Sequence, residues 1–495
     1  MEQVLLQLRG GISGAITSSE RARAAVSQDG SLFEITSDVV VTPKSVADVK
    51  TLVRLIADKK ATHPLLSITP RGAGTSLSGA AIGSSFVLDM QSLSSIRHFS
   101  SRLITAQPGA RIDDLQRILG AHSLELASAP ESSVGSTLGG MVAHNSAGPH
   151  SDLHGNTQAW VRSISIVLTD GNEYVVRPLK KAELERKIAE PTFEGRLYAH
   201  LLSLLEQQYD TIRNARPYAR WNTSGYNLWD VWDREAGIFD LTQLLIGSEG
   251  TLGVITQVTI EAAPKMTHVQ KLSLPAVPLK KIQPILDRMK ILGALSVDAF
   301  HDSKTSLVIE CGAQTAEGLV SQVEAVCENL VETGIDLRSI RYDAPDAPQT
   351  HTLIDDLAVH PRHVVSFARR LEKILKSRRV AAKIHFQPLS GTFCITSERP
   401  WRGTGEALEA VLRDCVHLVR EFDGTLSARH GDGLVRGPWL DAQYGPEVTA
   451  LFKRVKELFD PLYIFNPHKK TDAAWEYTVD HLRPSVPKRR RTLRG

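Results

Sequence analysis

Residues 71–79 form a glycine-rich loop, RGAGTSLSG, directly after a β-type run. Because glycine has no Cβ, such a loop lets backbone N–H groups come close to phosphate oxygens. Its glycines at 72, 74 and 79 lack the G-x-G-x-x-G spacing of a Rossmann fingerprint, and the residues that follow are poor helix formers. Residue types alone leave two interpretations: a phosphate-cradling loop of another kind, or an ordinary tight turn.

A second candidate lies near the C-terminus, where His430 stands in the loop sequence RHGDG. An unperturbed histidine has a pKa of about 6.5, which suits a general base. The flanking glycines allow a ligand to approach closely. A single loop histidine is more often structural than catalytic, so this pattern alone does not decide the chemistry.

The elements expected around these loops are of mixed type. Residues 38–120 alternate short strands with amphipathic helices, and residues 121–175 are rich in small side chains and end in a strand. Residues 266–342 predict the order β-α-β-β-α-β of a split ferredoxin-like unit, with a last strand over 336–342. After an irregular Pro-rich piece, an incomplete repeat of helix, two strands and helix is expected up to about residue 420.

Composition predicts a soluble globular protein of two or three domains. The chain has 495 residues, 42% of them hydrophobic, and a net charge of +3. It has no run of about 18 apolar residues, and its N-terminus lacks the pattern of a signal peptide. The four cysteines form no C-x-x-C pair, so they predict reduced thiols and neither an iron–sulfur cluster nor a zinc ribbon. We therefore expect a cytoplasmic protein.

The last eight residues carry five positive charges. A solvated, disordered tail over residues 481–495 is the simpler interpretation. Contact with an anionic lipid surface would place the protein at the inner face of the membrane. Binding of nucleic acid has only this tail in its favour, and we expect none.

Five segments occur together and in order: TPRGAGTSLSGAA from residue 69, STLGGMVAHNSAGPHSDLHGNT from 136, LLIGSEGTLGVITQVTI from 244, HGDG at 430–433, and FDP…FNP at 459–467. With them the chain resembles the FAD-linked oxidases of the vanillyl-alcohol oxidase and PCMH superfamily, among them D-lactate dehydrogenase, the glycolate oxidase FAD subunit and D-2-hydroxyglutarate dehydrogenase. The resemblance covers residues 25–470.

The resemblance implies an α+β fold: a PCMH-type, two-part FAD-binding domain over residues 1–265 and an antiparallel-sheet, ferredoxin-like cap, or substrate, domain over 266–425. A C-terminal segment, 426–480, would close on the flavin. The residues implied to bind FAD are Arg71, Gly72, Ala73, Gly74, Thr75, Ser76, Gly79, Pro108, Gly109, Ser136, Thr137, Gly139, Gly140, Asn145, Ser146, Gly148, Gly155, Glu249, Gly250, Gly253, Val254, Ile255 and Asn466. For Arg71, a phosphate contact and a surface charge beside the loop both remain open.

Some relatives attach the flavin covalently to a histidine of the first loop. Thr75 stands at that position, so the resemblance implies FAD that is bound without a covalent link. Replacement of Gly74 by a bulky residue should lower FAD occupancy, since its side chain would collide with the pyrophosphate.

The implied reaction is the oxidation of a D-2-hydroxy acid of lactate, glycolate or 2-hydroxyglutarate type, with hydride transfer to flavin N5. His430 would be the general base, because relatives carry their active-site histidine at the matching His-Gly position. The alternative is an FAD-binding subunit of a larger redox complex that has lost its own turnover. The electrons would leave to an external acceptor: a quinone, an iron–sulfur or electron-transfer protein, or oxygen.

The chain departs from its relatives at the metal site that many of them have. Gln387 and Cys394 stand where two histidine ligands would be, and Arg429 replaces a glutamate. These substitutions predict that no divalent metal binds. His385 could restore a site with Cys394 only through a shifted register. We expect Arg429 to act in catalysis by holding the substrate carboxylate.

Relatives also present a substrate-binding arginine from a Trp-x-x-Arg segment. This sequence has no such segment at the corresponding place, and Arg341 is the only nearby candidate.

Overall fold

The computed structural model describes residues 1–130, 135–301, 304–342, 351–397, 401 and 405–483. The N-terminal part contains a four-stranded sheet of order β1-β2-β4-β3, in which β2, β4 and β3 are parallel. Its strands are β1 (Ala15–Thr17), β2 (Val39–Thr42), β3 (Ile68–Arg71) and β4 (Phe86–Asp89). Helices α1 (Glu2–Gly11) and α3 (Val46–Lys59) pack on it, and α2 (Glu20–Val26) lies nearby. The glycine-rich loop begins where β3 ends.

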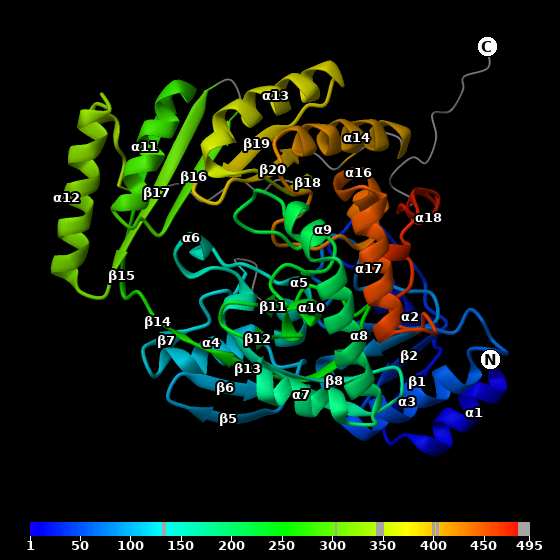
Figure 1. Cartoon of the computed structure of the whole chain (residues 1–495). Coiled ribbons are helices and arrows are strands. Elements are labelled where there is room, and N and C mark those ends of the chain that lie inside the picture. Colours follow the sequence, from blue (N-terminus) through cyan, green and yellow to red (C-terminus); the bar gives the residue numbers. More distant parts are fainter. Residues whose placement is uncertain (131–134, 302–303, 343–350, 398–400, 402–404, 484–495) are drawn as a thin grey trace, which may run out of the picture.

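A five-stranded antiparallel sheet of order β5-β6-β13-β8-β9 lies beside the first sheet (Figure 1). Its strands are β5 (Ile96–Ser100), β6 (Leu103–Ala106), β8 (Val161–Val167), β9 (Glu173–Val176) and β13 (Val254–Glu261). Because β13 pairs with both β6 and β8, it brings the segment at residues 247–255 next to strands formed much earlier in the chain. Smaller strands are β7 (Leu124–Glu125), β10 (Leu179–Lys180), β11 (Trp232–Asp233), β12 (Ile238–Phe239) and β14 (Ala263–Pro264).

Further helices lie in the N-terminal part and in the C-terminal segment. They are α4 (Ile112–Gly120), α5 (Leu138–His144), α6 (Ser151–His154), α7 (Lys181–Ala189), α8 (Phe193–Gln207), α9 (Tyr209–Asn214), α10 (Thr242–Leu245), α15 (Gly433–Arg436), α16 (Leu440–Tyr444), α17 (Pro446–Phe459) and α18 (Trp475–Asp480). Helix α17 packs against α8 in the core of the five-stranded sheet, so residues beyond 430 share a core with residues 104–262.

Residues 268–421 form a six-stranded antiparallel sheet of order β15-β17-β16-β19-β20-β18, with four helices on one face. Two β-α-β-β-α repeats build it and meet at the β16–β19 pair. The first contains β15 (His268–Val277), α11 (Leu279–Ile291), β16 (Ser296–His301), β17 (Thr305–Ala313) and α12 (Ala316–Glu332). The second contains β18 (His351–Ala358), α13 (Val364–Ser377), β19 (Lys383–Gln387), β20 (Thr392–Ser397) and α14 (Gly405–Glu421). Figure 1 shows the helices on the side away from the N-terminal part.

Two elements of this region differ from the sequence prediction. The strand expected over 336–342 is a short 3-10 helix, Leu337–Ser339, followed by an isolated bridge between Ser273 and Arg341. The Asp336 side chain accepts the Arg338 N–H at 3.0 Å, and such local capping competes with a strand ladder. The second repeat begins with β18, where only an irregular piece was expected. Strand β18 contains two aspartates and two register shifts, so its sequence lacks the regular alternation of polar and apolar residues that predicts a strand.

No helix among the described residues is long and apolar enough to cross a membrane. The basic residues of the predicted tail, from 488 onward, lie outside the described part of the chain.

Candidate active site

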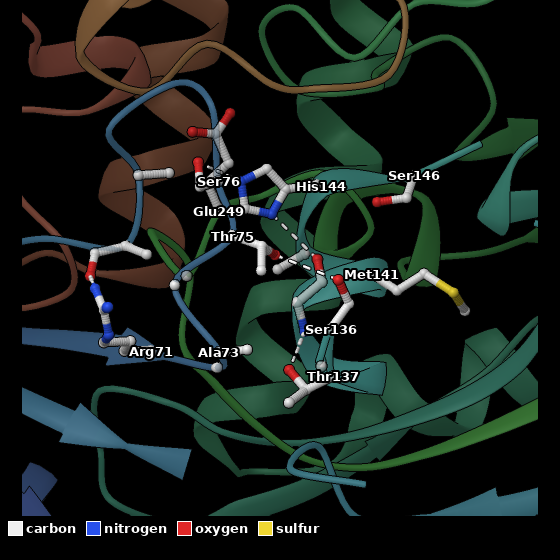
Figure 2. A pocket seen from close by; sticks show the side chains of 18 of the residues that line it. Arg71, Ala73, Thr75, Ser76, Ser136, Thr137, Met141, His144, Ser146 and Glu249 are labelled. Atoms are coloured by element: carbon white, nitrogen blue, oxygen red, sulfur yellow. Dashed lines mark hydrogen bonds between the residues drawn. The ribbon is translucent and has the colours of Figure 1, made fainter. Parts of the chain in front are cut away.

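A cavity of about 160 Å³ opens between the glycine-rich loop, the start of α5, the residues before β13 and the loop that carries His430. Figure 2 shows loop and α5 side chains facing each other across it. Most of the predicted site residues line it: Arg71, Gly72, Ala73, Gly74, Thr75, Ser76, Pro108, Ser136, Thr137, Gly139, Gly140, Ser146, Glu249, Gly250, Gly253, Ile255, Arg429 and His430. The tertiary structure thus brings four distant segments to one cavity.

The other predicted residues support these walls from behind. Asn466 is buried and donates from Nδ2 to the carbonyls of Ala80 and Glu249, both at 2.8 Å. Asn145 ends α5 in a left-handed conformation, and Val254 is fully buried in the core. Gly79, Gly109, Gly148 and Gly155 also lie outside the lining.

Arg71 lines the cavity but is anchored to the chain behind it. Its guanidinium is buried and donates to backbone carbonyls, with 2.9 Å to Ala81 and 2.9 Å to Gln28. It is therefore not a surface charge, and it holds the base of the loop; a contact with phosphate stays a prediction. Gly74, at φ +74°, lies directly above it, and a Cβ there would be 2.1 Å from Arg71 Nη2. A side chain at this position first meets Arg71, before any ligand.

Gly72 and Gly139 lie where neighbouring segments approach too closely for a side chain. A Cβ on Gly72 would lie 2.3 Å from Thr137 Oγ1, and one on Gly139 would lie 2.5 Å from the Pro108 Cβ. The glycine-rich loop and the residues before α4 can therefore both rest against the first turn of α5.

His144 lines the same cavity and was missed by the sequence analysis, where it is one more residue of a small-residue stretch. Its Nδ1 lies 3.1 Å from the Gly140 carbonyl and its Nε2 lies 3.1 Å from Ser76 Oγ (Figure 2). Because a carbonyl can only accept, Nδ1 carries the proton and the neutral Nε2 accepts from the serine hydroxyl. Burial lowers the pKa of His144, which agrees with a neutral ring that ties α5 to the loop.

His430 is held by two buried residues. Its Nδ1 contacts Asp355, and the other oxygen of that carboxylate accepts from both terminal nitrogens of Arg436, at 3.0 and 2.9 Å. Burial alone would lower the pKa of His430, but the carboxylates of Asp356 and Asp355 raise it above its ordinary value. Burial would likewise raise the pKa of Asp355, which Arg436 and His430 hold far below its usual range. Within the described part of the chain no group bonds to His430 Nε2, and the side chain is 37% exposed beside the cavity.

Asp356 fixes the backbone of the His430 loop. One carboxylate oxygen, Oδ2, accepts the N–H groups of Arg429 and His430, both at 2.6 Å, and the Ser427 hydroxyl at 2.8 Å. Asp356 itself has a φ of +72°, an uncommon value for a residue other than glycine. Sequence analysis missed both aspartates because it missed β18.

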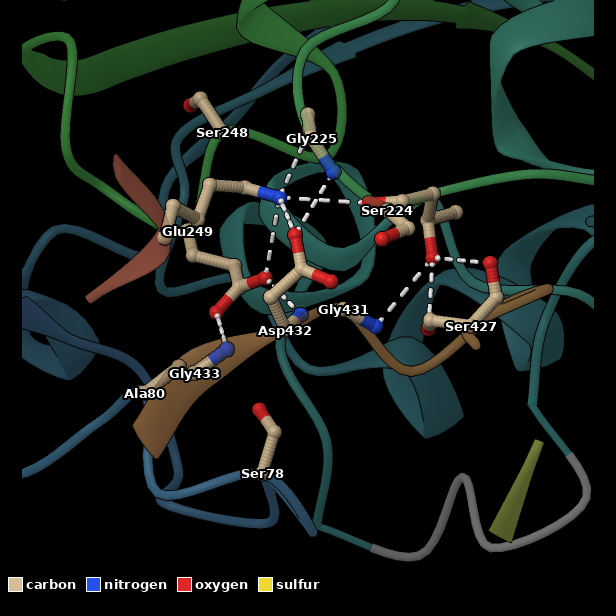
Figure 3. A network of polar contacts seen from close by, with 12 residues as sticks. Ser78, Ala80, Ser224, Gly225, Ser248, Glu249, Ser427, Gly431, Asp432 and Gly433 are labelled. Atoms are coloured by element: carbon tan, nitrogen blue, oxygen red, sulfur yellow. Dashed lines mark hydrogen bonds and ion pairs between the residues drawn. The ribbon is translucent and has the colours of Figure 1, made fainter. Parts of the chain in front are cut away.

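Behind this loop lies a buried charge network (Figure 3). The Glu249 carboxylate accepts the N–H groups of Asp432 at 2.5 Å and Gly433 at 2.7 Å. Lys470 Nζ lies 2.8 Å from Asp432 and 3.3 Å from Glu249. Burial alone would lower the pKa of Lys470, but these two carboxylates raise it. The network joins the segment before β13, the HGDG loop and the C-terminal segment, so it sets where His430 stands.

Arg429 and Gln387, two of the three residues from which the absence of a metal site is predicted, are hydrogen-bonded to each other. Arg429 Nη1 donates to Gln387 Oε1 at 2.7 Å. Burial raises the pKa of the nearby Cys394 thiol to about 12, which disfavours the thiolate that a metal requires. His385 is paired with Asp298 at 3.1 Å. Among the described residues, no group of three His, Cys, Asp or Glu side chains could hold a metal ion.

Arg341 does not join the site. It is exposed, bridges to the edge strand β15 and is absent from the cavity lining.

Comparison with known protein families agrees with this geometry. A model of the FAD binding domain matches residues 37–177, and a model of the C-terminal domain of FAD linked oxidases matches residues 295–470. Together the matches cover more than half of the chain. The chain belongs to the FAD-linked oxidase family.

Curated relatives of this FAD-linked oxidase include D-2-hydroxyglutarate dehydrogenase of Escherichia coli (strain K12), with 26% identity over 93% of this chain and 50% of that protein. The chain therefore spans about half the length of this relative. Glycolate oxidase subunit GlcD of Bacillus subtilis (strain 168) is 23% identical over 88% of this chain and 89% of that protein. A solved alkyldihydroxyacetonephosphate synthase aligns with a TM-score of 0.64 at 14% identity, over 95% of this chain and 86% of that chain, which shows a shared fold.

The lining of the cavity fits FAD. Its glycines expose backbone where two phosphates need donors, and its apolar side chains, such as Met141 and Ile255, suit a flavin ring. Glu249 is the one carboxylate among the lining residues, and both of its oxygens are already bonded to the HGDG loop. Lys470 Nζ lies 3.3 Å from this carboxylate, so its positive charge lessens the repulsion between Glu249 and a pyrophosphate.

Proposed function

We propose that this FAD-linked oxidase oxidises a D-2-hydroxy acid to the 2-oxo acid. The observation that carries the proposal is that His430 and Arg429 line the same cavity as the glycine-rich loop. When bound, FAD supplies the acceptor for the hydride that leaves C2 of the substrate. The curated relatives are named as dehydrogenases or oxidase subunits of such acids.

The residues divide the remaining work between them. His430 takes the hydroxyl proton at Nε2, because Asp355 occupies its Nδ1. Arg436 holds Asp355 in place, and the imidazolium formed by the reaction is stabilised by the same carboxylate. Arg429, which lines the cavity, holds the substrate carboxylate with the nitrogen not engaged by Gln387.

Residues 1–265 form the FAD-binding domain in this proposal, and residues 266–425 form a ferredoxin-like cap over the substrate. The C-terminal segment, 426–480, closes on the flavin, which is bound without a covalent link. The two repeats of the six-stranded sheet support the cap assignment, since each has ferredoxin-like strand and helix order. An external acceptor then reoxidises the flavin; one relative, from Arabidopsis thaliana, is named D-lactate dehydrogenase [cytochrome].

Anaerobic titration of the purified protein with D-2-hydroxy acids tests the proposal. Flavin absorbance should bleach with at least one acid, and His430→Ala should slow reduction by roughly 10²-fold or more without loss of FAD. Exposed His98→Ala is the matched control. Absence of bleaching with every acid would favour a subunit without turnover, and equal rates in His430→Ala and the parent would reject the base.

A further inference from the structure

The face of the six-stranded sheet opposite its helices carries polar side chains. Along β16 and β19, alternate residues such as Val297 and Phe386 are buried in the core that the helices share. The residues between them, Asp298, His385 and Gln387, therefore point to the other face. Helix α6 of the N-terminal part packs near β16 on that side. This polar face looks toward the FAD-binding part.

A row of hydrogen bonds joins this face to Arg429. His385 Nε2 donates to Asp298 Oδ1 at 3.1 Å, and Gln387 Nε2 donates to the same oxygen at 3.2 Å. Arg429 Nη1 donates to Gln387 Oε1 at 2.7 Å. Since a guanidinium only donates and a carboxylate only accepts, these two neighbours fix the orientation of the Gln387 amide. The Gln387 side chain thus holds Asp298 at a set position near Arg429.

Each end of the row has an atom that is not engaged. Among the described residues, none accepts from Arg429 Nη2 and none donates to Asp298 Oδ2, and the Asp298 side chain is 24% exposed. Burial raises the pKa of Asp298, but His385, Gln387 and Arg429 outweigh it and lower the pKa, so Asp298 is ionised at neutral pH. The row therefore offers a ligand one cationic donor, Arg429 Nη2, and one anionic acceptor, Asp298 Oδ2.

A second carboxyl group lies close to Arg429 and Asp298. Asp152 of α6 is buried, interacts electrostatically with both Arg429 and Asp298, and its Oδ1 has no hydrogen-bond partner in the described part of the chain. Arg220 Nη1 is 3.6 Å from it, but the guanidinium also donates to the backbone carbonyls of Asp152 and Leu389. Burial raises the pKa of Asp152 to about 7, so this carboxyl group is partly protonated at neutral pH, and Asp298 is the ionised acceptor near Arg429.

We propose that Asp298, held by Gln387, selects 2-hydroxy acids that have a single carboxylate and further hydroxyl groups, the class of the sugar acids. The inference rests on the proposed function and names its substrate class. A substrate hydroxyl can donate to Asp298 Oδ2 while its carboxylate binds Arg429 Nη2. An alkyl side chain would leave Asp298 Oδ2 desolvated without a donor, and a second carboxylate would face the negative charge of Asp298.

Matched acids test this selection in the reductive half-reaction. Stopped-flow reduction of the FAD enzyme is measured under anaerobic conditions with D-glycerate and D-lactate, which differ by one hydroxyl, and with D-2-hydroxyglutarate. We expect the second-order rate constant for D-glycerate to exceed that for D-lactate at least tenfold. It should exceed that for D-2-hydroxyglutarate by about 100-fold or more.

The variant Asp298→Asn keeps the size of the side chain and removes its charge. It should narrow both ratios, D-glycerate to D-lactate and D-glycerate to D-2-hydroxyglutarate, at least tenfold, with unchanged FAD content. Asp287→Asn, on the exposed face of α11, is the matched control and should leave both ratios unchanged. Gln387→Met should narrow the ratios as well, since it releases Asp298 from Arg429.

The outcomes separate the two claims. Reduction by D-lactate or D-2-hydroxyglutarate as fast as by D-glycerate overturns the selection and leaves the proposed oxidation intact. Ratios unchanged in Asp298→Asn also overturn it. Failure of every acid to reduce the flavin overturns the proposed function, and the selection with it.

Discussion

Replacement of Asp355 by asparagine should change the pH dependence of flavin reduction. Asp355 accepts from His430 Nδ1 on one side and from Arg436 at 3.0 and 2.9 Å on the other, so it is a buried carboxylate between two cationic groups. Together with Asp356 it raises the pKa of His430. The base must be neutral to act, and activity in the parent is therefore lost as the pH falls through a value above 6.5.

The expected size of the change follows from the contact. One carboxylate this close is worth about one pKa unit or more, which corresponds to about 1.4 kcal/mol. In Asp355→Asn the pH midpoint should move down by at least roughly one unit, since His430 loses one of the charges that favour protonation. The plateau rate should also fall by about 10²- to 10⁴-fold, because an amide no longer fixes the ring in the required tautomer.

Stopped-flow reduction from pH 5 to pH 9, with FAD content and unfolding temperature recorded in parallel, measures both effects. Asp210→Asn, at an exposed position of α9, is the control and should follow the parent. A midpoint that stays in place or moves up in Asp355→Asn would refute the assigned arrangement, whatever happens to the rate.

Four further outcomes are expected. Acid precipitation should release the flavin into the supernatant, and flavin retained by the polypeptide would contradict a non-covalent link. Chelation should leave flavin reduction unchanged, because a guanidinium–amide pair and a protonated thiol replace the metal ligands of relatives; a stoichiometric metal found by elemental analysis would reject this. Gly74→Ala should cost roughly 1–3 kcal/mol of unfolding free energy and lower FAD occupancy, while Gly10→Ala, with open space around it, should be neutral or stabilising. Lys470→Met should cost about 3–5 kcal/mol by chemical denaturation, against a negligible change for exposed Lys453→Met, and equal stability of the two would sink the role of the buried network.

The sequence by itself determined the family and the parts of the site that depend on local patterns. Loops in which glycine is required for close approach, such as those around Gly72 and Gly139, are visible as residue types at fixed spacing. Strands and helices with regular apolar periods, such as α3 and β16, are visible for the same reason. His430 could be named as the base only through the resemblance of its His-Gly motif to that of relatives, because a loop histidine is by itself more often structural.

Only the tertiary structure decided which charged groups surround that histidine. Asp355 lies 75 residues before His430, and Gln387 lies 42 residues before Arg429. The partner of a buried charge is set by which strands lie side by side, and this depends on packing of the whole core. For the same reason the sequence did not predict strand β18 or the backbone contacts of the Arg71 guanidinium. Bulges and buried guanidinium contacts are properties of the assembled fold.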